Sequence, residues 1–209
     1  DALEGIITSR QVKAGDHLLR AGEQAIRFFF VRCGLLREYY VDANGRESTR
    51  QFSGSGELSG SLADLLSDRV ADVSIEVLAA GEVLEAKWAS LSALAEQHIS
   101  LMRLLRRTAE ILYMRKTRRE FEMLTLTAAE RYRRFVQQHP GLDSQLHRHQ
   151  VASYLGITPV HLSRIHAAGR NGLGRTVKQS TDAVAELKKR RASPALLRPG
   201  EEVWEIHGR

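Results

Sequence analysis

Short runs of hydrophobic residues, each ended by Gly, Asn or Asp, follow one another from Gln11 to about Lys87. Asn44-Gly45 separates two of these runs, and both residues tolerate the positive φ that a tight hairpin turn requires. Residues 73–77 alternate between apolar and polar side chains, as a half-buried strand does. Many short strands with regular turns predict a sandwich or barrel over this part of the chain.

A pattern at helical spacing then runs from Leu91 to about Lys116 without Pro or Gly. Its stripe of positions alternates spacings of three and four over three heptads, as in a coiled-coil seam. We interpret the stripe as a dimer seam; the alternative is one helix buried against its own domain. Leu104, Ile111 and Met102 form a second apolar face, which we expect to pack on the barrel. The stripe comprises Leu91, Leu94, His98, Leu101, Leu105, Thr108 and Leu112.

Two further features follow this helix. The basic segment 115–119 is either a solvated turn or an elbow that faces phosphate. Thr127 and Glu130 then have the spacing of a capping box, and the sequence His-Pro-Gly at 139–141 stops a helix. We therefore predict a second helix from Thr127 to Gln138.

Residues 148–166 have the pattern of two helices joined by a tight turn. Small and apolar residues, among them Ala152, line the first helix, and Gly156 stands where that helix must end with positive φ. Thr158 is placed to cap a second helix, which has Pro159 in its first turn. Leu162 and Ile165 form the inner face of that second helix. This pattern predicts a helix-turn-helix, and the alternative is an ordinary helical hairpin.

Charge divides the chain of 209 residues into two parts. Residues 1–88 hold 10 Lys/Arg and 14 Asp/Glu, a net charge of −4. Residues 89–209 hold 21 Lys/Arg and 11 Asp/Glu, a net charge of +10. The basic part is a candidate for binding a polyanion such as nucleic acid, and the alternative is a solvated basic surface.

Several classes of protein are disfavoured by composition. No apolar run approaches the roughly 18 residues of a membrane span, and a single cysteine, Cys33, excludes an internal disulfide. We expect a cytoplasmic, reducing location. His17 is the only histidine before residue 89, so a metal site in the barrel is not expected. No Ser–His–Asp arrangement or phosphate-binding loop stands out, and neither an enzyme nor a cofactor is predicted.

Several stretches together resemble the CRP/FNR family of transcription regulators. They are Lys13-Ala14-Gly15-Asp16, Gly22-Glu23, residues 30–37, Gly56-Glu57-Leu58, Glu82-Val83, the long helix, and residues 152–165. The resemblance covers about residues 4–168. It implies an α+β fold with a double-stranded, jelly-roll-like β-roll (1–88), a dimerisation helix (89–116) and a winged helix-turn-helix domain (117–209). It also implies a homodimer that binds inverted repeats in double-stranded promoter DNA and contacts RNA polymerase.

The resemblance assigns residues of the helix-turn-helix to DNA. Arg164 is retained where the family places an arginine that contacts bases, and His161 lies three residues earlier on the same face. The family's Arg-Glu pair aligns with Pro159 and Val160, which departs from the pattern. The expected DNA contacts, with phosphate contacts first, are Arg148, His149, Thr158, Ser163, Val160, His161 and Arg164.

The residues expected at the effector pocket also differ from those of part of the family. Cyclic-AMP binders hold the cyclic phosphate with an Arg-Ser pair, and those positions are Ala71 and Asp72 here. A carboxylate repels phosphate, so we predict no cyclic-AMP response, while the pocket remains available to another small molecule. The candidate pocket residues are Glu57, Leu58, Ser59, Arg69 and Asp72.

Residues 167–209 do not follow the family pattern. They are open to three interpretations: a displaced wing, a basic extension, or the product of a shifted reading frame. The sequence thus predicts a sequence-specific, homodimeric DNA-binding regulator of unknown effector. The alternative is a ligand-sensing β-roll protein with weak or nonspecific DNA binding.

Overall fold

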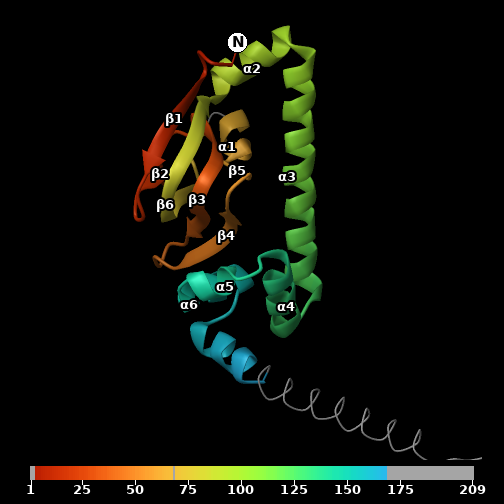
Figure 1. Ribbon diagram of the computed structural model, residues 1–209. Coiled ribbons are helices and arrows are strands. Elements are labelled where there is room, and N and C mark those ends of the chain that lie inside the picture. The colour runs from red at the N-terminus through yellow and green to blue at the C-terminus, as the bar shows by residue number, and fades with distance from the viewer. Residues whose placement is uncertain (1–2, 68, 169–209) are drawn as a thin grey trace, which may run out of the picture. The chain divides into compact units, whose positions relative to one another are not determined.

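The computed structural model describes residues 3–67 and 69–168. Six strands form one sheet; helix α1 lies between β5 and β6 in the chain, and the other helices follow β6 (Figure 1). The predicted wing and the rest of the tail beyond residue 168 lie outside the described residues. The strands are β1 (Ile7–Val12), β2 (His17–Leu19), β3 (Arg27–Val41), β4 (Glu47–Ser53), β5 (Leu58–Ser59) and β6 (Val73–Lys87). The helices are α1 (Leu62–Ser67), α2 (Trp88–Gln97), α3 (Ile99–Thr125), α4 (Ala128–Gln138), α5 (Leu142–Gln145) and α6 (Arg148–Leu155).

The sheet is antiparallel throughout and is the β-roll that the family resemblance implies. Its order is β1-β6-β3-β4, with β2 paired to β6 and β5 paired to β3. The hairpin predicted at Asn44-Gly45 joins β3 and β4, and Gly45 has a φ of 75°. The Asp42 carboxylate accepts hydrogen bonds from the backbone N–H groups of Asn44 and Arg46, each at 2.9 Å, which fixes the turn.

Two glycines that break the apolar pattern lie inside strands and not in turns. Gly34 and Gly81 lie where β3 and β6 cross, amid shifts in strand register. A Cβ added to Gly81 would lie 2.1 Å from the Cys33 carbonyl oxygen. Because only hydrogen fits between these backbones, β3 and β6 continue as 15-residue strands through positions that resemble turns in the sequence.

The core of the β-roll is formed by side chains that alternate along these strands. Val31, Val73, Ile75, Val77 and Val83 are fully buried. They belong to one hydrophobic cluster together with residues of β1 and β2. This inner face stabilises the sheet, while the alternate positions of β6 remain free for polar side chains such as Glu76.

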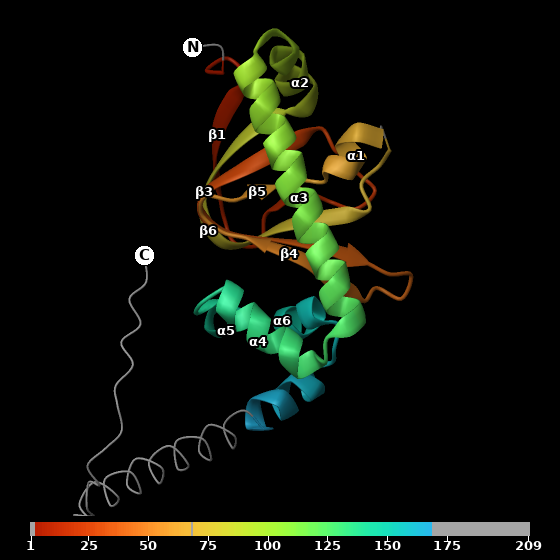
Figure 2. The same cartoon turned by 90° about the vertical axis from the view of Figure 1, so that its right-hand side faces the viewer.

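The prediction of one continuous helix over residues 91–116 is wrong at His98. This residue has extended backbone angles, φ −131° and ψ 103°, and separates α2 from α3. The helix then continues to Thr125, so the basic segment 115–119 lies inside α3 and is neither a turn nor an elbow. Figures 1 and 2 show α3 running beside the sheet from α2 toward α4.

One of the two apolar faces of α3 differs from the prediction. In the stripe interpreted as a dimer seam, Leu101 is buried and Leu105, Thr108 and Leu112 are half-buried, so the chain itself covers that stripe in part. The face expected to pack on the barrel is exposed instead. Its members Leu104, Met102 and Ile111 are 59%, 42% and 42% exposed.

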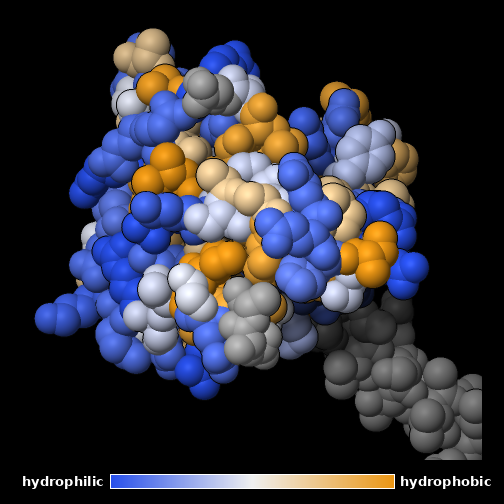
Figure 3. All heavy atoms as spheres, turned by 90° about the horizontal axis from the view of Figure 1, so that it is seen from above, coloured by the Kyte–Doolittle hydropathy of each residue, from blue (hydrophilic) through white to orange (hydrophobic). Residues whose placement is uncertain are grey.

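Exposed hydrophobic side chains are not confined to α3. Seen from the end that carries α2, the surface shows hydrophobic side chains at several places among hydrophilic ones (Figure 3). Within the part of the chain that the structure describes, no helix is both long and apolar enough to cross a membrane.

Candidate nucleic-acid interface

The helix-turn-helix is preceded by a helix, α4, whose start the sequence predicts. Thr127 caps α4: its hydroxyl accepts from the Glu130 N–H at 3.3 Å, and the Glu130 carboxylate accepts from the Thr127 N–H at 2.9 Å. This reciprocal pair is a capping box. Hydrogen bonds from Thr127 also hold the pKa of Glu130 below its usual value. The helix ends at Gln138, before the His-Pro-Gly stop.

The turn between the two helices of the motif has the predicted geometry. Gly156 adopts the left-handed conformation, φ 68° and ψ 35°, at the end of α6. The Ile157 N–H returns to the Ala152 carbonyl at 3.0 Å, and the Thr158 hydroxyl accepts from the His161 N–H at 3.2 Å. Residues 159–168 are helical. The predicted helix-turn-helix is therefore present in the described part of the chain.

The motif has its own core, and part of that core comes from the sheet. Val151, Ala152, Leu155 and Leu162 are buried together with Phe135 of α4. Phe52 of β4 belongs to the same cluster. Its ring centroid lies 5.5 Å from that of Tyr154 on α6 and 6.2 Å from that of Phe135. Burial raises the pKa of Tyr154, so its phenol stays protonated over the physiological range.

Two arginines hold the carboxyl-terminal end of α6. Arg119 of α3 donates to the Tyr154 carbonyl, and its guanidinium carbon lies 4.0 Å from the centre of the Tyr154 ring. Arg131 of α4 donates to the Leu155 carbonyl at 3.0 Å. The last carbonyls of a helix lack partners within that helix and carry partial negative charge. Guanidinium groups therefore suit them, and they tie α6 to α3 and α4.

The sequence pattern did not reveal these arginines. Arg119 belongs to the segment interpreted as a turn or elbow, and Arg131 lies in the predicted second helix without a predicted role. Neither position has a spacing relation to Gly156 that would reveal the contact. The stacking of Arg119 on Tyr154 depends on where α3 passes, which no local pattern shows.

The predicted DNA contacts come from the start of α6 and from residues 158–164, and nearly all of them are exposed. Arg148, His149, Thr158, Val160, His161 and Arg164 are all exposed, and Ser163 is half-buried. The Ser163 hydroxyl donates to the Pro159 carbonyl at 3.0 Å and accepts from Arg148 Nη1 at 3.4 Å, which links the two helices. The rings of His147 and His149 stack with centroids 5.7 Å apart. Cationic or polar groups thus gather at the amino-terminal end of α6, where phosphate is favoured.

The structure places the predicted effector residues in different surroundings. Glu57 forms an ion pair with Arg115 of α3 at 3.0 Å. Ser59 is buried and donates to the Glu38 carboxylate at 2.7 Å. Arg69 and Asp72 are exposed. Desolvation by burial raises the pKa of Glu38, although Arg50 lies 3.5 Å from it.

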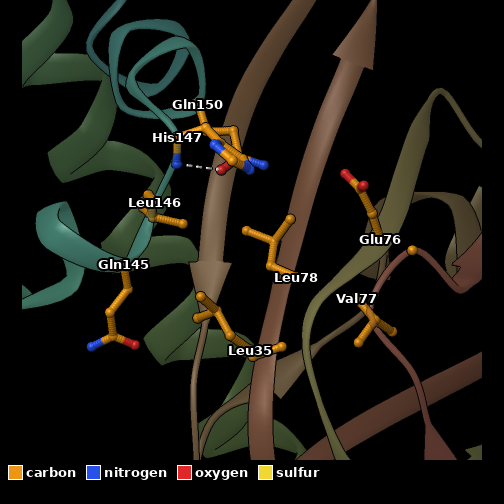
Figure 4. Close-up of a pocket in the computed structure, with 10 residues that line it drawn as sticks. Leu35, Glu76, Val77, Leu78, Gln145, Leu146, His147 and Gln150 are labelled. Carbon is orange, nitrogen blue, oxygen red and sulfur yellow. Dashed lines mark hydrogen bonds between the residues drawn. The ribbon is translucent and has the colours of Figure 1, made fainter.

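A cavity of about 270 Å³ lies instead between the sheet and the segment from α5 to α6. Leu35, Leu78 and Leu146 supply its apolar walls, and Glu76, His147 and Gln150 its polar ones (Figure 4). The Gln150 amide oxygen accepts from the His147 N–H at 3.0 Å. Among the described residues, no group of three or more His, Cys, Asp or Glu side chains is arranged to hold a metal ion.

Comparisons with known proteins agree with this architecture. The cyclic nucleotide-binding domain family matches residues 9–98. The chain is similar to FixK2 from Bradyrhizobium japonicum, with 19% identity, a TM-score of 0.70, and coverage of 80% of this chain and 86% of that one. It is also similar to the c-di-GMP-responsive global regulator CLP from Xanthomonas campestris, with 20% identity, a TM-score of 0.65, and coverage of 82% and 91%.

A third similar structure is described as a transcriptional regulator of the CRP/FNR family, from Eubacterium rectale. Its identity is 12% and its TM-score 0.67, with coverage of 82% of each chain. No curated protein matches the chain. Residues 9–98 thus match the cyclic nucleotide-binding domain family, and the chain shares its fold with these solved structures, one of which is described as a CRP/FNR-family regulator.

Proposed function

We propose that this chain is a sequence-specific DNA-binding transcription regulator that acts as a homodimer. The observation that carries the proposal is the helix-turn-helix of α6 and residues 159–168, whose turn, cap and core are complete and whose polar surface is exposed. A helix in this position of the motif enters the major groove. The excess of basic residues after residue 88 favours a polyanionic partner.

Within this proposal, Arg164 contacts a base, and four of the other residues contact phosphate. A guanidinium can donate to both N7 and O6 of guanine, which contributes about 1–3 kcal/mol of discrimination. Arg148, His149 and Thr158 lie at helix starts, and Ser163 lies one turn into the helix 159–168. These four residues fix the position on the DNA backbone without specifying sequence. His161 and Val160 are the remaining candidates for contact in the groove.

The dimer is proposed to form along α3. Leu101 is buried and Leu112 is half-buried, whereas a second stripe at spacings of seven and three is exposed. Leu104, Ile111, Met114 and Phe121 are 59%, 42%, 66% and 53% exposed. A parallel partner helix would bury this stripe. We therefore propose this exposed stripe, in place of the stripe from Leu91 to Leu112, as the seam.

We propose that cyclic AMP is not the effector. Ala71 is buried and carries no charge, and Asp72 is an exposed carboxylate. The carboxylate of Asp72 and the lack of a cationic side chain at position 71 disfavour a phosphate ligand here.

The experiment is binding selection from a random DNA duplex library with the purified protein and no added ligand. We expect an enriched inverted repeat with half-sites about 34 Å apart, one helical turn. The variant Arg164→Ala should lose base preference at one position of each half-site. Arg20→Ala, which removes the same charge from an exposed position of the β-roll, should keep the selected sequence unchanged.

The second candidate is a ligand-sensing β-roll protein with nonspecific DNA binding. Val160, at 63% exposure, is the observation in its favour, because an apolar side chain replaces a base-reading one at the start of the recognition helix. Salt-sensitive binding to all duplexes without enrichment would support this candidate and contradict the first. An enriched inverted repeat would exclude it.

A further inference from the structure

A single hydroxyl group joins the helix-turn-helix to the edge of the β-roll. The backbone N–H of Thr49 in β4 donates to Ser153 Oγ of α6 at 2.7 Å. Ser153 Oγ donates in turn to the Glu47 carbonyl at 3.0 Å. β4 is the terminal strand of the sheet order, so these two backbone groups face no further strand. The Ser153 hydroxyl therefore satisfies both the Thr49 N–H and the Glu47 carbonyl of an edge strand.

The hydrogen bonds behind this serine all run in one direction. Arg37 Nε donates to Thr49 Oγ1 at 2.9 Å, and an arginine side chain can only donate. The Ser153 proton is engaged by the Glu47 carbonyl, so the Thr49 hydroxyl donates to Ser153 Oγ, 3.0 Å away. The order is therefore Arg37, Thr49, Ser153, Glu47. Each bond polarises the next, which strengthens the chain.

The β-roll holds the first member of this chain firmly in place. The Arg37 side chain is 2% exposed. Its Nη1 lies 2.7 Å from the Glu47 carboxylate and 3.4 Å from that of Glu76, and its guanidinium carbon is 4.4 Å from the centre of the Tyr39 ring. Glu76 also lines the cavity whose opposite wall includes Gln150 of α6 (Figure 4). The hydrogen-bond chain thus starts at a fixed cation beside that cavity.

The contact leaves the proposed DNA surface free. Ser153 follows Arg148 by five residues, so the two side chains point about 140° apart around α6. Arg148 and His149 are exposed, while Ser153 faces β4. β4 therefore does not cover the phosphate-binding end of the helix. The contact orients α6 and does not block it.

We propose that Ser153, with Thr49 and Arg37 behind it, is a positioning residue that fixes the orientation of the helix-turn-helix on the β-roll. This inference rests on the proposed function. In a dimer, the orientation of each reading helix relative to its own β-roll determines the separation of the two reading helices. The Ser153 contact accordingly determines which spacing between half-sites the protein accepts.

The test compares Ser153→Ala with Ser144→Ala in the full chain. Ser144 is exposed on α5 and donates to the Gly141 carbonyl at 2.7 Å, so its variant also removes a serine hydroxyl that is hydrogen-bonded to backbone, but away from β4. The first measurement is amide hydrogen exchange at Thr49, without DNA. We expect Ser153→Ala to exchange about five- to tenfold faster, the loss of about one hydrogen bond, and Ser144→Ala to match the wild type.

The second measurement is affinity for inverted repeats with lengthened or shortened spacers, and for a single half-site. Ser153→Ala should bind repeats one or two base pairs longer or shorter nearly as well as the preferred repeat, while its affinity for the half-site stays unchanged. Thr49→Val, which keeps the backbone N–H but removes the hydroxyl of the relay, should relax the spacing in the same direction.

Two results would overturn the inference. An unchanged exchange rate at Thr49 in Ser153→Ala would show that the contact does not hold β4. If Ser153→Ala exchanged faster at Thr49 but kept the spacer preference of the wild type, the contact would exist without a positioning role. If the wild type selects no inverted repeat, the proposed function and the spacing role fail together, and the exchange rate still decides whether the contact holds β4.

Discussion

The turn of the helix-turn-helix gives the sharpest quantitative prediction. Replacing Gly156 by Ala places a Cβ at a residue with a φ of 68°. Gly141, which precedes α5, has a φ of 77°, and a Cβ added there would meet no heavy atom within 4 Å, so Gly141→Ala measures the backbone cost alone. At Gly156 the added Cβ would lie 2.6 Å from Met123 Cε. The two variants therefore differ by one side-chain contact.

The expected losses follow from these two contributions. The left-handed conformation costs an L-residue about 1–2 kcal/mol, and restriction of the unfolded chain offsets about 0.4–1 kcal/mol of that. Gly141→Ala should therefore lower the free energy of unfolding by about 1 kcal/mol. Met123 is 38% exposed, so its terminal methyl can rotate away at a cost of about 0.5–1.5 kcal/mol. Gly156→Ala should then lose about 2 kcal/mol.

The assay is equilibrium unfolding in urea, followed by DNA affinity. In the double variant Gly156→Ala/Met123→Ala, the contact with the Met123 side chain is gone. Its free energy of unfolding, measured relative to Met123→Ala, should therefore fall only by the amount seen for Gly141→Ala. Gly156→Ala should also weaken binding to the selected repeat, whereas Gly141→Ala should not. If Gly156→Ala were as stable as the wild type, the left-handed turn would be wrong. A loss that persists unchanged in the double variant would refute the Met123 contact.

Two further predictions concern groups outside the turn. Thr127→Ala removes the capping box of α4 and should lower the free energy of unfolding, measured in urea, by about 1 kcal/mol. The control Thr117→Ala, at an exposed position of α3, should lower it far less. Equal losses would contradict the role of the cap. Burial raises the pKa of Glu38 above its ordinary value of 4.5, so the unfolded chain releases its proton first and stability falls as pH rises from that value to the pKa in the folded protein. Glu38→Gln cannot titrate and should not show that fall in thermal unfolding between pH 4 and 8. The exposed control Glu96→Gln should follow the wild type. Parallel curves for Glu38→Gln and the wild type would contradict a raised pKa of Glu38 in the folded protein.

Local sequence determined the elements whose energetics are local. A hairpin at Asn44-Gly45 depends on residues that tolerate positive φ, and the capping box of Thr127 depends on a partner three positions away. The helix-turn-helix is of the same kind, because Gly156, Thr158 and the apolar positions around them lie within one short segment. These features were therefore predictable before the fold was known.

The glycines inside strands could not be distinguished from turn glycines by the local sequence. A glycine after an apolar run has the same appearance in the sequence whether the chain turns or another backbone passes closely. Gly34 and Gly81 are the second case, since the Cys33 carbonyl occupies the place of a side chain at Gly81. That approach is made by residues almost fifty positions apart, and only the paired strands reveal it.

The tertiary structure decided which face of α3 is covered and where α6 is anchored. The heptad spacing shows that α3 has more than one apolar face, but not which face the β-roll covers and which remains for a partner. The break at His98 occurs without Pro or Gly, so its cause is not local. Arg119, Ser153 and Thr49 acquire their roles only when α3, α6 and β4 come together. Periodicity measures the direction of side chains around one element, and contacts between distant elements depend on packing that no single element encodes.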